Sequence, residues 1–278
     1  MGPNDEQAGF WDELTQSWLD GEQHSRVFTE PYGRAAMDLL GLEAGQRVLE
    51  VGCGSGATTI ELAGRVSPGG SVVGVDIAPG MIEAARQRAE GVDGVEFRVA
   101  DAQSTDLGSE RFDAVFSRFG VMFFADPVVA FANLREALVS GGILAFACWS
   151  DLFANEWMFL PGAAVVSVTG VMPPMPGPGE PGPFSLGDRD ELAGLLERAG
   201  FAEVTIDVRP DVIELPATKI DSMVELACSI GPAHEALRAA DENTTSAIVA
   251  AIREVIAERI VDGFISLTAN ALVVSARR

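Results

Sequence analysis

The residues best suited to chemistry are a glycine-rich turn and three carboxylates. The turn is the run Glu50-Val51-Gly52-Cys53-Gly54-Ser55-Gly56, which follows a short apolar stretch and precedes a helical one. Glycines there let the backbone turn tightly and let a ligand lie against bare main chain. Glu50 begins this run, and Asp76 and Asp101 follow the next two apolar stretches. This pattern predicts a site for a nucleotide-like ligand.

Two classes of ligand fit the turn. The G-x-G-x-x-A spacing of residues 52–57, with Asp76 about 20 residues further on, matches the fingerprint of dinucleotide sites. Three features favour a sulfonium ligand instead. An anion at Glu50 suits a cationic amino-acid group and opposes a pyrophosphate. Asp101 can accept a hydrogen bond from an adenine amino group. The order of the last predicted elements also differs from the second half of a dinucleotide domain.

The elements that position these residues alternate along the chain. Strands are predicted at 47–51, 69–76, 95–100, 111–117 and 141–150, with helices at 57–66, 79–90 and 126–139. This alternation predicts an α/β fold whose parallel sheet is covered on both faces. Further helices are predicted at 8–20, 33–41 and 188–200, the last with Asp188 as N-cap and Gly200 as its stop. A strand at 201–209, helical stretches between 216 and 262, and a strand at 263–278 follow.

Composition narrows the class of partner. The 278 residues are 47% hydrophobic and carry a formal net charge of -22. A chain this acidic repels phosphate backbones and anionic lipids, so we expect neither nucleic acid nor membrane as a partner. Cys53, Cys148 and Cys228 form no metal-binding or disulfide pattern, which fits the reducing cytoplasm and no metal. We also expect no signal peptide and no membrane span.

The successive motifs resemble those of class I S-adenosylmethionine-dependent methyltransferases. The resemblance covers residues 40–208 and rests on VLEVGCGSG, VVGVDIAPGMIEAAR, VEFRVADAQ, RFDAVFSRFGVMFFADP and LVSGGILAFACW. It is strongest for the small-molecule branch with ubiquinone/menaquinone-type and "type 11" domains. It implies a Rossmann-like, seven-stranded sheet with an antiparallel last strand and a helical cap inserted before that strand. It also implies S-adenosyl-L-methionine as cofactor and S-adenosyl-L-homocysteine as product.

The resemblance further implies which positions bind the cofactor. Glu50 and the glycine turn would hold the methionine part, together with main chain at the end of the fourth strand. Asp76 would accept the ribose hydroxyls, and the residues after the third strand would border the adenine. The implied set is Glu50, Gly52, Cys53, Gly54, Ser55, Gly56, Asp76, Ile77, Met81, Asp101, Ala102, Gln103, Ser117 and Arg118.

Few titratable residues are available for catalysis. Methyl transfer from a sulfonium is an in-line displacement in which the protein mainly supplies alignment and desolvation. A general base is needed only where the acceptor must lose a proton. His24 and Tyr32, in the N-terminal segment, are the predicted catalytic candidates, whereas His234 is expected at the surface.

The predicted acceptor site is aromatic. Its candidates are Trp18, Phe119, Phe123 and Trp149, with core packing as the alternative for the two phenylalanines. Trp11 and Trp18 either fold over the cofactor as a lid or only staple the N-terminal helix. The sequence leaves both alternatives open.

The predicted organisation has three parts. Residues 1–42 form an N-terminal helical lid, residues 43–209 and 263–278 the cofactor domain, and residues 210–262 an apolar helical cap. The Pro/Gly-rich segment 170–187 is predicted to be a loop that serves as hinge or entrance. The cap helices are alternatively the interface of a homodimer.

Three functions fit these features. The first is methyl transfer to a small organic acceptor of secondary-metabolite, quinone-like or lipidic type. The second is a cyclase-like protein of the same fold that binds the cofactor without methylating. The third, an NAD(P)-dependent oxidoreductase, lacks a Tyr-x-x-x-Lys pair, because Tyr32 and Lys219 are the only tyrosine and lysine.

Overall fold

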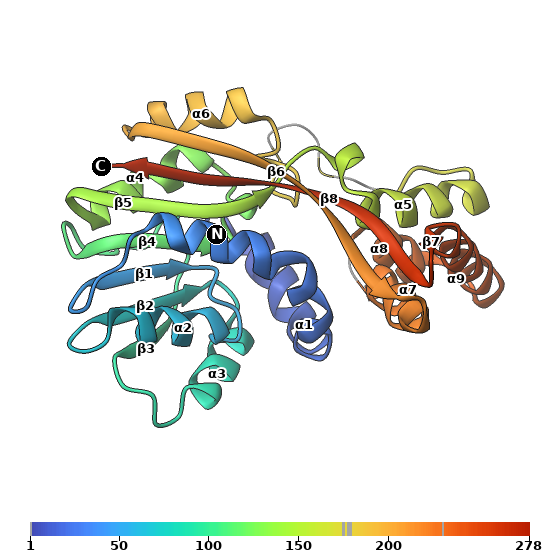
Figure 1. Ribbon diagram of the computed structural model, residues 1–278, viewed down its shortest axis with the longest axis horizontal. Helices are drawn as coiled ribbons and strands as arrows, with labels where there is room; N and C mark the ends of the chain where they lie inside the picture. Colours follow the sequence, from blue (N-terminus) through green and yellow to red (C-terminus); the bar gives the residue numbers. More distant parts are fainter. Residues whose placement is uncertain (1, 174–175, 177–179, 230) are drawn as a thin grey trace.

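One twisted sheet organises the molecule (Figure 1). The computed structural model describes residues 2–173, 176, 180–229 and 231–278, apart from the side chains of residues 23 and 24. The seven-stranded sheet implied by the motifs is confirmed, and a two-residue strand, β7 (Ile260–Val261), adds an eighth at one end. The strands follow the order β3 (Val95–Val99), β2 (Ser71–Asp76), β1 (Arg47–Val51), β4 (Phe112–Arg118), β5 (Leu138–Trp149), β8 (Phe264–Arg277) and β6 (Ala202–Pro216).

The five strands from β1 to β5 are parallel, as the alternation of elements predicts. Helices α2 (Ala57–Val66), α3 (Pro79–Arg88) and α4 (Pro127–Ala137) connect them. Helices cover both faces of a sheet of this kind, so β1, β2 and β4 are apolar and buried along most of their length. Parallel pairing brings the carboxyl ends of β1, β2 and β4 to one edge, where α/β folds bind ligands.

The antiparallel half is longer than the sequence indicates. Strand β8 pairs with β5 from Ile143↔Arg277 to Trp149↔Ala271, and with β6 from Ala202↔Arg277 to Pro216↔Phe264. Residues 210–216, predicted to begin the helical cap, instead continue β6, because each has a pairing partner on β8. The β6–β8 pair therefore runs beyond the parallel strands and carries the cap at its far end (Figure 1).

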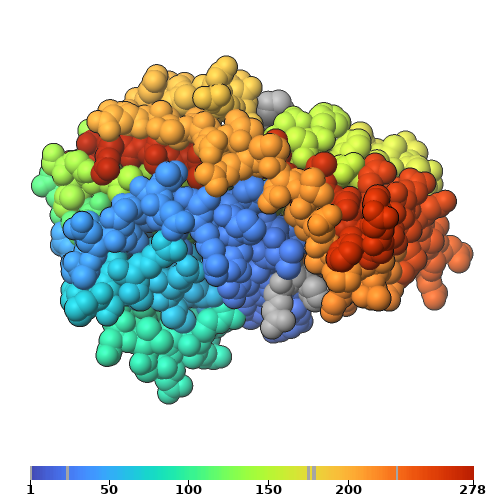
Figure 2. Space-filling view, in the orientation of Figure 1, coloured from blue at the N-terminus to red at the C-terminus, as the bar shows by residue number. Residues whose placement is uncertain are grey.

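The N-terminal segment is a single helix, α1 (Asp5–Leu39), rather than the two helices predicted at 8–20 and 33–41. Its buried face places Phe28, Tyr32 and Ala36 at i, i+4 and i+8. Glu30 forms ion pairs with Arg26 (3.1 Å) and Arg34 (2.6 Å), which bridge the turn containing Pro31. Proline disfavours helix interiors, but burial of this face stabilises the helix on both sides of Pro31. Figure 2 shows α1, in blue, between the sheet and the cap.

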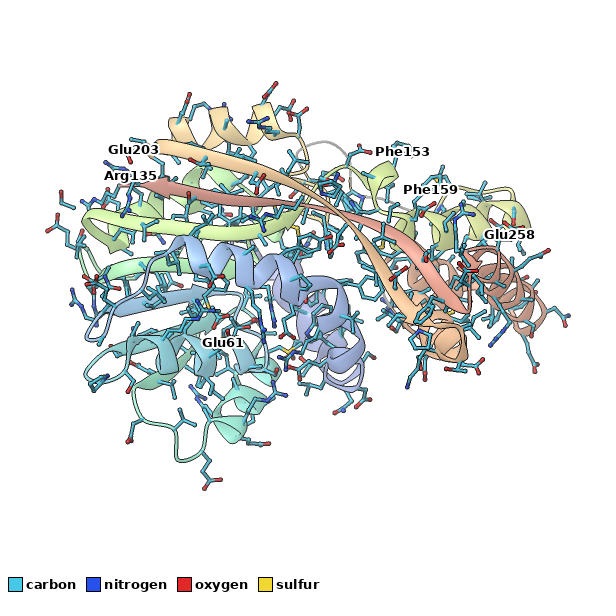
Figure 3. All side chains as sticks on the ribbon, viewed as in Figure 1. Glu61, Arg135, Phe153, Phe159, Glu203 and Glu258 are labelled. Carbon is cyan, nitrogen blue, oxygen red and sulfur yellow. The ribbon has the colours of Figure 1, made fainter. Side chains whose placement is uncertain are left out.

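The cap consists of four helices: α5 (Glu156–Thr169), α7 (Ile220–Ser229), α8 (Gly231–Ala239) and α9 (Glu242–Ala257). Helix α5 was not predicted, since its apolar sequence has no polar face to signal a helix. Buried residues at i, i+4 and i+8 of α9, namely Ile248, Ile252 and Ile256, form part of the cap core. On the outside, Phe153 is 73% exposed and packs on Phe159 (Figure 3). No helix in the described ranges is long and apolar enough to cross a membrane.

Short 3₁₀ turns also occur in the described connections, namely η1 (Val121–Phe123), η2 (Leu152–Ala154) and η3 (Ala217–Lys219). Helix α6 (Arg189–Arg198) confirms both of its predicted ends. The Asp188 carboxylate accepts the N–H groups of Asp190 and Glu191, and Gly200 has φ +91°. The Arg135 Nε donates to the Gly200 carbonyl (2.7 Å), at the end of the sheet opposite the cap (Figure 3).

Candidate cofactor and acceptor site

A cavity of about 460 Å³ lies where the carboxyl ends of β1, β2 and β4 meet α1 and the cap. Its volume falls within the range of small-molecule sites. The structure places fifteen of the predicted site residues on its wall. They are Glu50, Gly52, Cys53, Gly54, Ser55, Asp76, Ile77, Met81, Asp101, Ala102 and Arg118 from the cofactor set, and Trp18, Phe119, Phe123 and Trp149 from the acceptor set.

Three residues of the cofactor set do not line this cavity. Gly56 precedes α2 and faces the Phe97 ring, which a Cβ on Gly56 would approach to 2.8 Å. The Ser117 hydroxyl is buried, where it donates to the Val51 carbonyl (2.8 Å) and accepts from the Gly120 N–H. Gln103 is buried beneath the N-terminus of α1. The Ser117 and Gln103 side chains hold their loops in place behind the wall.

The glycine turn packs closely against neighbouring backbone at Gly52 and is open to the cavity at Gly54. Gly52 has φ +67°, and a Cβ there would lie 2.9 Å from the Gly120 Cα. Gly54 has φ +52°, and a Cβ there would meet nothing within 4 Å, because Gly54 faces the cavity. The open space beside Gly54, which we call the cradle, is therefore available to a ligand and would be occupied by any side chain at this position.

The Glu50 carboxyl lies at the end of β1 with 2% of the residue exposed. It accepts a hydrogen bond from the Thr59 hydroxyl. Burial raises the pKa of Glu50 to about 8, although the Thr59 hydrogen bond and the Arg118 charge oppose that shift. A cation placed beside this carboxyl would favour its ionised form.

Arg118 brings a positive charge to the same part of the cavity. Its stem passes under α1, so that a Cβ on Gly33 would lie 2.5 Å from the Arg118 Cδ. Burial lowers the pKa of Arg118, the nearby Glu50 raises it, and Arg26 lowers it further. Among the described residues, none forms a hydrogen bond or an ion pair with the Arg118 side chain. Its guanidinium is therefore free to bind an anionic group of a ligand.

Two further carboxylates follow the neighbouring strands. Asp76 accepts the N–H groups of Gly54 (2.9 Å) and Ala78 (3.0 Å), and burial raises the pKa of Asp76 despite these donors. Asp101 accepts the N–H of Gln103 (2.9 Å) and the hydroxyl of Ser104 (2.7 Å). Each carboxylate thus helps to hold its own loop. A carboxylate has about four lone-pair sites, so both retain acceptor capacity towards the cavity.

The N-terminus of α1 supplies two site residues that sequence reasoning missed. The Asn4 amide donates to the Asp101 carboxylate (2.9 Å), and its oxygen accepts the Ala125 N–H (2.8 Å). Gln7, one turn later, lines the cavity, and its Oε1 is buried without a hydrogen-bond partner. The spacing of Asn4 and Gln7 matches a helix-capping motif, yet Asn4 makes no cap hydrogen bond. The sequence motif therefore suggests that Asn4 caps its own helix, whereas in the structure Asn4 binds residues far away in the chain.

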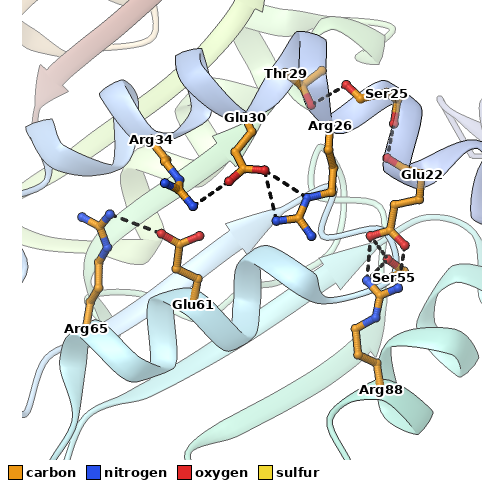
Figure 4. Close-up of polar contacts among 10 residues, drawn as sticks. All are labelled: Glu22, Ser25, Arg26, Thr29, Glu30, Arg34, Ser55, Glu61, Arg65 and Arg88. Atoms are coloured by element: carbon orange, nitrogen blue, oxygen red, sulfur yellow. Dashed lines mark hydrogen bonds and ion pairs between the residues drawn. The ribbon is translucent and has the colours of Figure 1, made fainter. Parts of the chain in front are cut away.

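A polar clamp fastens the middle of α1 to the glycine turn (Figure 4). The Arg88 guanidinium binds both carboxylate oxygens of Glu22, with Nη1 2.7 Å from Oε1. Arg88 and Glu22 also bind the Ser55 hydroxyl, at 2.6 and 3.0 Å. Because Arg88 belongs to α3 and Ser55 to the turn, this clamp joins three elements around the cavity.

Aromatic side chains form another part of the wall. Trp11 packs edge-on against Trp18 (5.6 Å between ring centroids) and against Phe123 (5.0 Å). Both tryptophans also line the cavity. Trp149 lies 4.3 Å from Phe119 and 5.0 Å from Trp157 of the cap. This half of the cavity can hold a large apolar, planar ligand.

The structure places the residues considered for catalysis differently from the sequence prediction. The His24 side chain lies outside the described residues. Tyr32 is 3% exposed and does not line the cavity, since its ring packs edge-on against Phe119 and Trp149. Its hydroxyl has no hydrogen-bond partner, and burial raises the pKa of Tyr32 well above its ordinary value. The expectation that His234 lies at the surface was wrong, because α8 brings it to the cavity wall.

Comparison with known proteins identifies the family. Residues 48–142 match a methyltransferase domain family. Nocamycin O-methyltransferase of Saccharothrix syringae is 32% identical over 213 residues, 73% of this chain and 75% of the relative. Aklanonic acid methyltransferase DauC of Streptomyces sp. (strain C5) is 39% identical over 137 residues, 48% of this chain and 61% of the relative.

A solved structure supports the fold. Haemonchus contortus phosphoethanolamine N-methyltransferase 2, in complex with S-adenosyl-L-methionine, has a TM-score of 0.55 at 19% identity. The match covers 88% of this chain and 52% of that protein. The chain belongs to the class I S-adenosylmethionine-dependent methyltransferases, with S-adenosyl-L-methionine as its cofactor. Family membership decides against the nicotinamide alternative that the glycine pattern left open.

Proposed function

We propose that this methyltransferase acts on a small organic acceptor with an aromatic ring system. The observation that carries the proposal is the aromatic lining of the cavity, which Trp149, Trp157 and Phe119 form as one cluster and Trp11 and Phe123 as another. Flat, apolar walls of this kind favour stacked or edge-on contacts with an aromatic ligand. Relatives named for nocamycin and aklanonic acid support a secondary-metabolite acceptor.

We infer one orientation of the cofactor from the charges and the open space on the cavity wall. The amino-acid end would lie between the Glu50 carboxyl and the Arg118 guanidinium, which offer opposite charges to an ammonium and a carboxylate. The cradle at Gly54 leaves room for this part of the ligand. Asp76 would accept the ribose hydroxyls, and the unpaired Gln7 Oε1 would accept the adenine amino group beside Asp101.

When bound, the cofactor supplies a methyl group on a sulfonium, which is already activated for displacement. The chain's own contribution is alignment and exclusion of water. Helix α1 closes one side of the cavity through Asn4 and the Glu22–Arg88 clamp, and the cap closes the other through Trp157. The cytoplasmic location, the homodimer and the three-part domain division stay predictions.

The proposal is tested in two steps. Calorimetric titration should detect binding of S-adenosyl-L-methionine and none of NADH. Incubation with the cofactor and 2-naphthol, 2-naphthoic acid or cyclohexanol should then add a methyl group to an aromatic probe and leave cyclohexanol unchanged, as mass spectrometry would show. Equal methylation of cyclohexanol, or no binding of either aromatic probe, would contradict an aromatic acceptor.

A further inference from the structure

The cavity wall carries few groups able to accept a proton. Among the described side chains, Glu50, Asp76 and Asp101 lie at the proposed cofactor end. Glu22 is held by Arg88, whose hydrogen bond lowers the pKa of Glu22 and makes it a weaker base. The cap contributes two more titratable residues, His234 and Glu235, both on α8. A base that serves the acceptor must be sought there.

The orientation of the His234 ring follows from one contact. Its Nδ1 lies 3.3 Å from the main-chain oxygen of Cys228, in the last turn of α7. A carbonyl oxygen can only accept a hydrogen bond, so Nδ1 must carry the proton. In the neutral ring, the lone pair therefore lies on Nε2. The contact with α7 fixes the tautomer and leaves the second nitrogen available.

We propose that His234 is the general base of the reaction and that the acceptor group is an aromatic hydroxyl. This inference rests on the proposed aromatic acceptor. The acceptor oxygen gives its proton to Nε2 and bonds to the methyl carbon while the carbon–sulfur bond breaks, with the bonding pair leaving on sulfur. The imidazolium then releases its proton to water, which a half-buried ring on the cavity wall can reach.

The chemistry of the acceptor explains why a base matters here. A carboxylic acid is already ionised at neutral pH and needs no base, whereas a phenol is mostly protonated. Imidazole is a stronger base than a carboxylate, so His234 suits a phenol better than its neighbour Glu235 does. A histidine held in one tautomer on the cap side of the cavity therefore favours hydroxyl over carboxyl methylation.

The test compares two probes of the same shape in the full-length protein. His234→Gln should lower kcat/KM for 2-naphthol roughly 100-fold or more, the effect of removing a general base. The same variant should methylate 2-naphthoic acid as wild type does, and calorimetry should show unchanged cofactor binding. Arg238→Gln, on the exposed end of α8, is the matched control and should leave both reactions unchanged.

Each contrary outcome overturns a different step. If wild type binds neither probe, the aromatic acceptor is wrong. If wild type methylates 2-naphthoic acid but not 2-naphthol, or binds 2-naphthol without methylating it, the hydroxyl acceptor is wrong. If His234→Gln lowers both reactions equally or neither, or if Glu235→Gln alone abolishes 2-naphthol methylation, His234 is not the base.

Discussion

Replacing Glu50 by glutamine should remove a pH-dependent cost of folding. Burial raises the pKa of this carboxyl from an ordinary 4.5 to about 8. A carboxyl whose pKa rises on folding contributes stability that is fully present below pH 4.5 and is lost as the pH rises to 8. Each unit of pKa corresponds to about 1.4 kcal/mol, so the loss over this interval amounts to about 5 kcal/mol. Glutamine keeps the shape and does not titrate.

The assay is urea unfolding of the cofactor-free wild type and of Glu50→Gln, followed by circular dichroism between pH 4.5 and 8.5. Every other group titrates alike in both proteins, so the difference in unfolding free energy isolates Glu50. We expect the variant to gain stability over wild type steadily as the pH rises, by about 5 kcal/mol in total. If the difference in unfolding free energy between the two proteins stayed constant with pH, the pKa of Glu50 would not be raised by folding. That result would refute the prediction.

The same carboxyl should couple cofactor binding to pH. Glu50 must ionise to pair with the cofactor's ammonium, so the affinity of wild type should fall by up to about tenfold per pH unit below pH 8. The variant should bind roughly 10- to 100-fold more weakly at pH 8 and lack this dependence. Calorimetry in two buffers of different ionisation enthalpy measures both the affinity and the proton released. Equal affinities at pH 8 would refute the role of Glu50.

Four further substitutions test the cavity. Gly54→Ala should cost about 1–2 kcal/mol of stability but fill the cradle and abolish calorimetric cofactor binding. Gly52→Ala, whose Cβ would lie 2.9 Å from facing backbone, should cost more in urea unfolding; the reverse order would contradict the geometry. Asn4→Ala should weaken cofactor binding roughly tenfold and speed hydrogen exchange at the start of α1, because the hydrogen bond from Asn4 to Asp101 is lost. Unchanged exchange would show that this hydrogen bond does not hold the start of α1 in place. Arg88→Met should cost about 1 kcal/mol through loss of its pair with Glu22, a difference that high salt should shrink; a salt-independent difference would argue against the clamp.

Local signals in the sequence were enough for the parallel half of the fold. The apolar runs that end at Val51, Asp76 and Val99 form strands, and the glycine turn lies between strand and helix as predicted. Asp188 and Gly200 mark the ends of α6. These features depend on residues near one another in the chain, where period, capping and backbone freedom act directly.

Long-range packing decided the remaining elements. Helix α1 continues through Pro31 because its apolar face is buried along the sheet. Residues 210–216 are strand because β8 supplies their hydrogen-bond partners. Neither outcome can be read from a local window, since the stabilising contacts come from residues distant in sequence.

The site divides in the same way. The sequence by itself determined the glycine turn and the carboxylates Glu50, Asp76 and Asp101, because each stands at the end of a strand whose position in a parallel sheet is set by the βαβ pattern. Only the tertiary structure brought Asn4 to Asp101 and moved His234 from the expected surface to the cavity wall. Their places depend on how α1 and the cap pack against the sheet, and no local pattern in either segment encodes that packing.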